Sequence, residues 1–89
     1  MEYRPELVSD TVRGALDRYV QQGIPTGSFL RAVLANNLME AFERADDQNV
    51  RNLFHICAYV YNELPMACRG SEKVVDAWIS VKRLLREAD

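Results

Sequence analysis

Residues 23–28, Gly-Ile-Pro-Thr-Gly-Ser, combine two glycines with two hydroxyl side chains just before a long apolar run with helical spacing. Free N–H groups at a helix N-terminus favour anions, so Thr26, Gly27 and Ser28 could help to bind a phosphate. Arg31, one turn further, could add a charge-assisted contact. A nucleoside-triphosphatase loop is excluded, because it needs wider glycine spacing, a lysine and a preceding strand. The simpler alternative is structural: the first glycine ends one helix and Ser28 caps the next.

His55 is the only histidine, and helical spacing places Tyr59 and Asn62 on the same face of its helix. We expect this face to point to solvent. Neither neighbour is a strong base, so the set predicts stacking and polar contacts to a ligand and no acid–base catalysis.

Cys68 lies in Cys-Arg-Gly-Ser before a predicted helix start, a setting in which the pKa of a thiol can fall. A cysteine phosphatase loop would need an arginine where Val74 stands, so packing is the simpler interpretation. Cys57 is predicted to face inward and His55 outward, which leaves no residues with metal-ligand spacing. We therefore expect no catalytic residues, no metal and no cofactor. A hydrolase that uses His55 or Cys68 is the weakest hypothesis.

The composition is that of one packed domain covering residues 1–89, with 48% hydrophobic and 27% charged residues. The formal net charge of -2 gives no long-range attraction to nucleic acid. Two cysteines are too few for a disulfide framework and suit a reducing compartment. The sequence shows no membrane-length apolar run and no signal-peptide pattern, so we expect a cytoplasmic protein with no membrane partner.

Apolar residues recur three and four positions apart, which predicts helices and no strands. Four helical segments result: Pro5–Gln22, Ser28–Ala45, Asp47–Leu64, and a last one from Ser71 to the end of the chain. Short connections of this kind are typical of helical bundles. The predicted fold is therefore all-α, a compact bundle of about four helices.

Apolar side chains are more numerous than the predicted core faces require. Those faces already include Leu38, Met39, Phe42, Val81, Leu84 and Leu85. Outside them lie Phe29, Val33, Ile56, Tyr59, Val75 and Ile79. Apolar side chains flanked by polar ones predict a self-association surface, and hence a homo-oligomer. The alternative is that the helical phases differ from these and the core is larger.

With these residues in view, the chain resembles small helical proteins encoded by bacteriophages and prophages. The resemblance lies in GIPTGSFLRAVLANNL, RADDQN, YVYNELP, CRGS and VVDAW, between Gly23 and Trp78. In that pattern an Asn-Asp pair often stands where this chain has Asn36 and Asn37. The resemblance implies a small accessory phage protein of the bacterial cytoplasm that acts by stoichiometric binding, as a host-takeover or counter-defence factor.

The predicted function is capture of a ligand or a host factor by a homo-oligomeric, non-enzymatic protein. A phosphorylated nucleotide signal is one candidate ligand and a host protein is another. The predicted ligand-binding residues are Thr26, Gly27, Ser28, Arg31, His55, Tyr59 and Asn62. The alternative is a helix-turn-helix DNA-binding regulator over Val20–Asn37, although its second helix offers few polar side chains for base readout.

Overall fold

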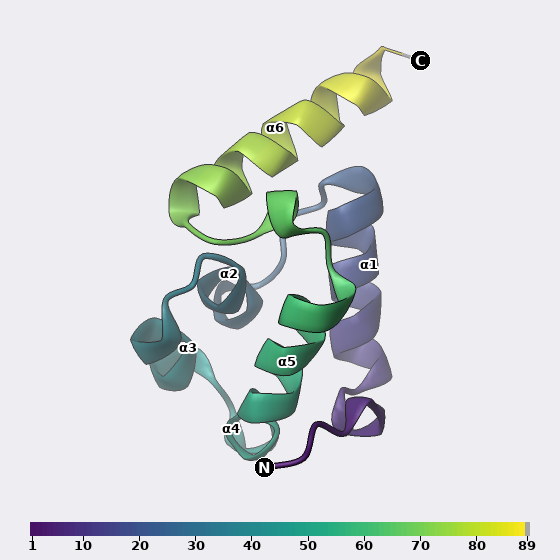
Figure 1. The fold of residues 1–89 in the computed structure, drawn as a ribbon. Coiled ribbons are helices and arrows are strands. Elements are labelled where there is room, and N and C mark those ends of the chain that lie inside the picture. Colours follow the sequence, from purple (N-terminus) through teal and green to yellow (C-terminus); the bar gives the residue numbers. More distant parts are fainter. Residues whose placement is uncertain (89) are drawn as a thin grey trace.

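The computed structural model describes residues 1–88, which form six α-helices and two 3₁₀-helices and contain no strand (Figure 1). The all-α class is therefore confirmed. None of these helices is long and apolar enough to cross a membrane. The elements are η1 Pro5–Leu7, α1 Asp10–Gln22, α2 Ser28–Leu34, α3 Leu38–Arg44, α4 Asp47–Arg51, α5 Leu53–Glu63, η2 Met66–Cys68 and α6 Glu72–Glu87.

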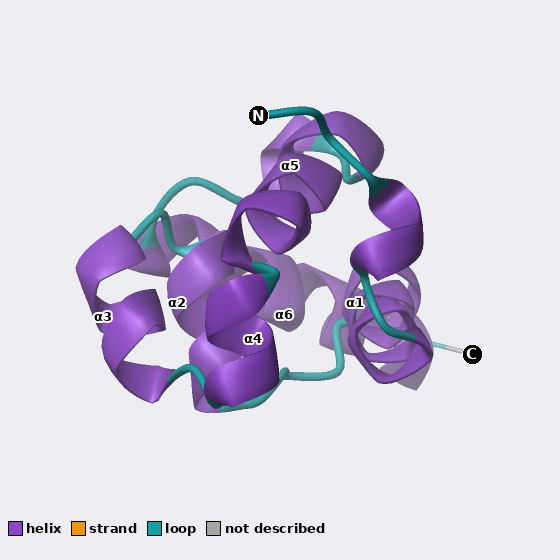
Figure 2. Ribbon diagram, turned by 90° about the horizontal axis from the view of Figure 1, so that it is seen from below, coloured by secondary structure: helices purple, strands orange, loops and turns teal. Residues whose placement is uncertain are grey.

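The helices surround α2, which contacts α3, α5 and α6. The long helix α6 crosses one end of the bundle, packs against α1 and η2, and rises away from the bundle toward its C-terminus (Figure 1). At the other end, η1 packs against α5. The view from below shows α3 on one side of the molecule, α1 on the other, and α4 between them (Figure 2).

Local capping signals explain most helix ends. Gly23 ends α1 in the left-handed conformation, with φ 70°, as predicted. Ser71 caps α6, as predicted, because its Oγ accepts a hydrogen bond from Val74 N–H at 3.1 Å. Ser28 does not cap α2: Gly27 occupies the cap position and makes no side-chain bond. The first helix starts later than predicted, because Ser9 caps it after the separate turn η1.

Two of the four expected segments are interrupted at asparagines, which gives six helices. Asn36 adopts a left-handed conformation with φ 61°, and Asn37 then caps α3 by accepting a bond from Glu40 N–H at 3.1 Å. Asparagine tolerates this conformation better than other non-glycine residues, so the helix ends and restarts here. Asn52, with φ -104° and no side-chain cap bond, separates α4 from α5, and α5 ends before Pro65 as predicted.

Tyr19 joins three elements in the centre of the molecule. Its side chain is fully buried, and its hydroxyl donates a hydrogen bond to the Cys68 carbonyl at 2.6 Å. The Trp78 indole N–H donates to the Tyr19 carbonyl at 3.1 Å. These two bonds fix η2 and α6 to α1, and both use polar atoms that would be costly to bury without partners.

The predicted oligomer surface is wrong, because its residues belong to the core of the single chain. Phe29, Ile56 and Val75 are buried, and Val33 and Ile79 are half-buried against them. For α2 and α3 the break at Asn36 and Asn37 explains the difference, because it separates the two helical phases that the prediction had joined. On α5 and α6 the bundle covers a different face of each helix from the one predicted. Instead, several residues predicted for the core are exposed: Leu38, Met39, Phe42, Val81, Leu84 and Leu85.

Candidate binding groove

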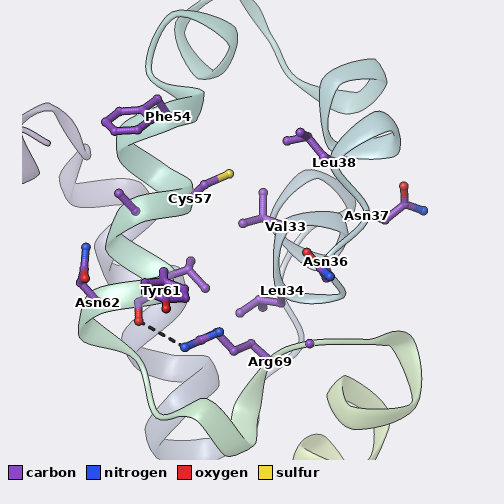
Figure 3. Close-up of a pocket in the computed structure, with 13 residues that line it drawn as sticks. Val33, Leu34, Asn36, Asn37, Leu38, Phe54, Cys57, Tyr61, Asn62 and Arg69 are labelled. Carbon is purple, nitrogen blue, oxygen red and sulfur yellow. Dashed lines mark hydrogen bonds between the residues drawn. The ribbon is translucent and has the colours of Figure 1, made fainter. Parts of the chain in front are cut away.

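A groove with a volume of about 530 Å³ lies between α5 and the junction of α2 with α3 (Figure 3). Its middle is apolar. Val33 on α2 and Cys57 on α5 point toward one another across it, and Leu34 and Leu38 extend the wall on the α2–α3 side. Burial raises the pKa of the Cys57 thiol, so this side chain stays neutral and adds to the apolar lining.

Arg69 closes one end of the groove (Figure 3). Its Nη2 donates a hydrogen bond to the Tyr61 carbonyl at 3.2 Å, and its guanidinium carbon lies 4.9 Å from the centre of the Tyr61 ring. Its Nε is buried and has no hydrogen-bond partner within residues 1–88. Arg69 is the only charged side chain among the described residues that line the groove. The groove therefore offers apolar contacts in its middle and, at its end, one cation that Tyr61 holds in place.

Asparagine amides lie along the margins of the groove. Asn36 and Asn37 stand at the α2–α3 junction, and Asn62 stands on α5. Asn36 and Asn37 are placed there by the helix break, which leaves both side chains exposed. The Asn37 amide is already bonded to Glu40 at both its oxygen and its nitrogen, so Asn36 and Asn62 are the amides left to contact the polar edge of a bound partner.

Arg31 lies outside the groove and connects α2 to α6. Its guanidinium donates to Glu72 Oε2 at 2.8 Å and to Asp76 Oδ1 at 2.6 Å. Both bonds raise the pKa of Arg31, and the bond with Asp76 contributes more than the bond with Glu72. An anion at the start of α2 would have to compete with two carboxylates for this cation, so the structure gives Arg31 a role in packing rather than a free anion contact.

The loop that precedes α2 also makes local contacts. Thr26 Oγ1 donates a hydrogen bond to the Gly27 carbonyl at 3.1 Å, and Ser28 forms the exposed first residue of α2. Gly23, at the start of the loop, packs against Lys82 of α6. The loop is thus a turn beside α6, and its residues are not among those that line the groove.

The predicted solvent-facing set on α5 is largely covered. His55 is 7% exposed, and its Nδ1 accepts a hydrogen bond from Arg4 N–H at 3.1 Å. The Arg13 guanidinium lies 5.0 Å from the centre of the half-buried Tyr59 ring. Helical periodicity within α5 could not reveal this, because the covering residues come from the N-terminal segment, about fifty positions away in the sequence. Of the seven predicted ligand residues, only Asn62 lines the groove.

The cysteine prediction of packing agrees with the buried position of Cys68, whose pKa is raised by burial. Sequence reasoning missed Arg69 and Tyr61 as neighbours in a site. It also missed the groove wall that the helix break creates. The signal that could have revealed this wall is the pair Asn36-Asn37 in the middle of an otherwise apolar helical run, since asparagine favours turns and caps.

Within residues 1–88, no cluster of three or more histidine, cysteine, aspartate or glutamate side chains could hold a metal ion. Comparisons with protein-family models, with curated proteins and with solved structures find no match to this chain. Inference about its function therefore depends on the geometry of the groove and of the exposed surfaces.

Proposed function

We propose that the protein is a non-enzymatic binding protein whose groove captures an apolar helical segment of a partner protein, with a carboxylate of that segment contacting Arg69. The observation that carries this proposal is the combination of an apolar groove with one cation, Arg69, at its end, the single charged side chain among the described residues that line it. Amphipathic helices bind such grooves through apolar side chains at helical spacing. A carboxylate beside those side chains would satisfy the guanidinium and fix the register of the helix.

The apolar surface next to the groove supports a macromolecular partner. Leu38 lines the groove and is 56% exposed, and Met39 and Phe42 follow it on α3, at 77% and 54% exposure. Met39 and Phe42 also line a neighbouring hollow with Glu43. A small ligand held in the groove would leave this surface uncovered, whereas a helix longer than the groove would cover it.

Capture of a phosphorylated nucleotide has weaker support. A phosphate group carries more than one negative charge and is usually bound by several donors, but Arg69 is the only cation among the described groove residues. DNA binding has weaker support as well, because Arg31, the cation of the supposed recognition helix, is paired with two carboxylates. A phage-type counter-defence role, in which the partner is a host protein, is the form of the proposal that the sequence resemblance favours.

Two synthetic amphipathic helical peptides test the proposal. One carries a glutamate beside its leucines, and the other carries glutamine at that position. We expect the glutamate peptide to bind about 3- to 10-fold more tightly by fluorescence anisotropy, because only it can pair with Arg69. In NMR spectra the peptide should shift the amide signals of groove residues, such as Val33 and Cys57, more than those of α1.

The substitution Arg69→Gln should remove the difference between the two peptides while leaving the apolar contribution. Arg83→Gln is the matched control, because Arg83 is 68% exposed and lies on α6, outside the groove. Equal affinity for both peptides in the wild-type protein, or signals shifted away from the groove, would contradict the proposal. A second experiment titrates the protein with phosphorylated nucleotides by calorimetry. Tight binding of a nucleotide would favour the nucleotide alternative.

A further inference from the structure

The helix α6 has two apolar faces, and only one of them is covered by the bundle. The covered face contains Val75, which is 1% exposed, and Trp78 and Ile79, which pack against the core. About a third of a turn away lies a second apolar stripe. Its larger members are Val81 and Leu84, which are 54% and 66% exposed.

This second stripe has the spacing of a coiled-coil seam. Its residues are separated by three, four, three and four positions, the pattern that keeps one stripe facing a partner helix over several turns. The stripe is half-buried at its first residue and exposed along the rest. Its members, called the α6 seam below, are Val74, Ala77, Val81, Leu84 and Ala88.

We infer that the α6 seam pairs with the α6 seam of a second copy, in antiparallel orientation, to form a homodimer. The charges beside the seam specify both the occupant and the orientation. Lys73 and Glu87 are exposed and flank the seam on the same side, one near each end of α6. Glu87 also forms an exposed ion pair with Arg83 one turn before it, at 3.3 Å, which leaves its second carboxylate oxygen for a contact with a second copy. In an antiparallel pair each Lys73 lies opposite Glu87 of the second copy, so two complementary contacts form. In a parallel pair the position opposite Lys73 is occupied by Trp78 of the second copy.

The antiparallel arrangement also matches side-chain size. It places Val74 opposite Leu84 of the second copy and Ala77 opposite Val81 of the second copy, so the largest side chain, Leu84, never faces itself. Figure 1 shows that the C-terminal half of α6 rises away from the bundle, which leaves this part of the helix accessible to a second copy. None of the residues that line the groove belongs to α6, so this inference is independent of the proposed function.

The cations of α6 argue against a membrane as the occupant of the seam. Lys82 and Arg86 lie on the side of α6 that faces away from the seam, and Lys82 lies over the Trp78 ring at 4.9 Å. An interfacial helix instead carries its cations along both borders of its apolar face, where they meet anionic headgroups. The seam is short, so we expect a weak interface, with a dissociation constant of the dimer in the micromolar range or above.

Sedimentation equilibrium of the full chain, from low micromolar to near-millimolar concentration, tests the inference. We expect a reversible monomer–dimer equilibrium for the wild-type protein. Leu84→Glu should weaken the dimer at least about 10-fold, because a charge then lies in the seam. The helix content should be unchanged by circular dichroism, since Leu84 is exposed in the monomer. Met66→Glu is the matched control and should leave the dimer unchanged, because it places the same charge at an apolar residue of η2 that is 78% exposed and lies outside both the seam and the groove.

Exchanging the charges of Lys73 and Glu87 tests whether the two helices pair in the antiparallel orientation. Lys73→Glu should weaken the dimer about threefold or more, because the new carboxylate then lies opposite Glu87 of the second copy. The double variant Lys73→Glu, Glu87→Lys should recover most of that loss, although it also removes the pair between Arg83 and Glu87 within α6. A protein that stays monomeric throughout would overturn the inference, as would a dimer that is insensitive to Leu84→Glu or not rescued by the double variant. Binding of the monomer to anionic vesicles that is lost in Leu84→Glu would show that the seam serves a membrane instead.

Discussion

At the scale of single residues, Gly23 has the most demanding steric requirement of the four glycines. Its φ of 70° lies in the region that residues with side chains rarely adopt. A Cβ atom placed on it would lie 2.5 Å from the Cβ of Lys82 and 3.2 Å from the Ile79 carbonyl oxygen. The absence of a side chain at Gly23 therefore ends α1 and also allows α6 to approach it closely.

The substitution Gly23→Ala should lower the free energy of unfolding by about 2–4 kcal/mol, since left-handed strain and overpacking against α6 add together. Urea denaturation monitored by circular dichroism measures this. Gly27→Ala is the control, because Gly27 has an ordinary φ of -67° and nothing within 4 Å of the added atom. Gly27→Ala should cost about 0.5 kcal/mol or less, because the lower entropy of the unfolded chain offsets most of the poorer fit of alanine at the N-cap of α2. Equal losses at the two positions would show that α6 does not pack against this turn.

At the scale of the elements, the break between α2 and α3 decides where the groove lies. A continuous helix through Asn36 and Asn37 would carry Leu38 and its neighbours onward along the α2 axis. The left-handed Asn36 and the cap formed by Asn37 instead redirect the chain, so that Leu38 reaches the groove wall. The binding surface thus depends on two residues that stop a helix.

Asn36→Ala should cost about 1 kcal/mol of stability, because alanine is strained in the left-handed conformation. Asn36→Gly should be neutral or stabilising, because glycine adopts that conformation without strain. Denaturant melts measure both changes, and far-ultraviolet circular dichroism reports helix content. If Asn36→Ala instead stabilised the protein and raised its helix content, a continuous helix over this stretch would be favoured and the described break would be wrong.

At the scale of the whole molecule, three acidic groups, two of them buried and one half-buried, have raised pKa values in the folded state. Burial raises the pKa of Tyr19, Cys57 and Cys68, because their charged forms would lose hydration. The Tyr19 hydroxyl also uses its proton in the bond to the Cys68 carbonyl that joins α1 to η2. These groups hold their protons more tightly in the folded chain than in the unfolded one.

The free energy of unfolding should therefore be constant up to about pH 8 and fall above about pH 9, where the unfolded thiols and then the unfolded tyrosine release their protons. Each group contributes a slope of up to about 1.4 kcal/mol per pH unit between its unfolded and folded pKa values. Urea denaturation from pH 7 to pH 11 measures this. Tyr19→Phe should lower stability by about 1 kcal/mol at pH 7 and make the alkaline loss shallower. A free energy of unfolding that does not change between pH 7 and pH 11 would contradict the burial of these groups.

The sequence predicted the features that depend on neighbouring residues. The all-helical class, the end of α1 at Gly23, the cap of α6 at Ser71 and the end of α5 before Pro65 all follow from local spacing and capping chemistry. It did not predict the faces of the helices, because each helix carries apolar side chains around much of its circumference. Several faces could have been buried, so periodicity alone could not select one.

Tertiary packing made that selection. The N-terminal segment covers His55, so a residue expected in solvent became part of the core, while α6 turned Val75 inward and left Leu84 outside. Arg31 forms hydrogen bonds with two carboxylates of α6. Arg69, which is distant in sequence from α2, is the cation that lines the groove. Local sequence determined the helices because capping and propensity act over a few residues. Burial and site geometry were decided only by contacts between residues far apart in the chain.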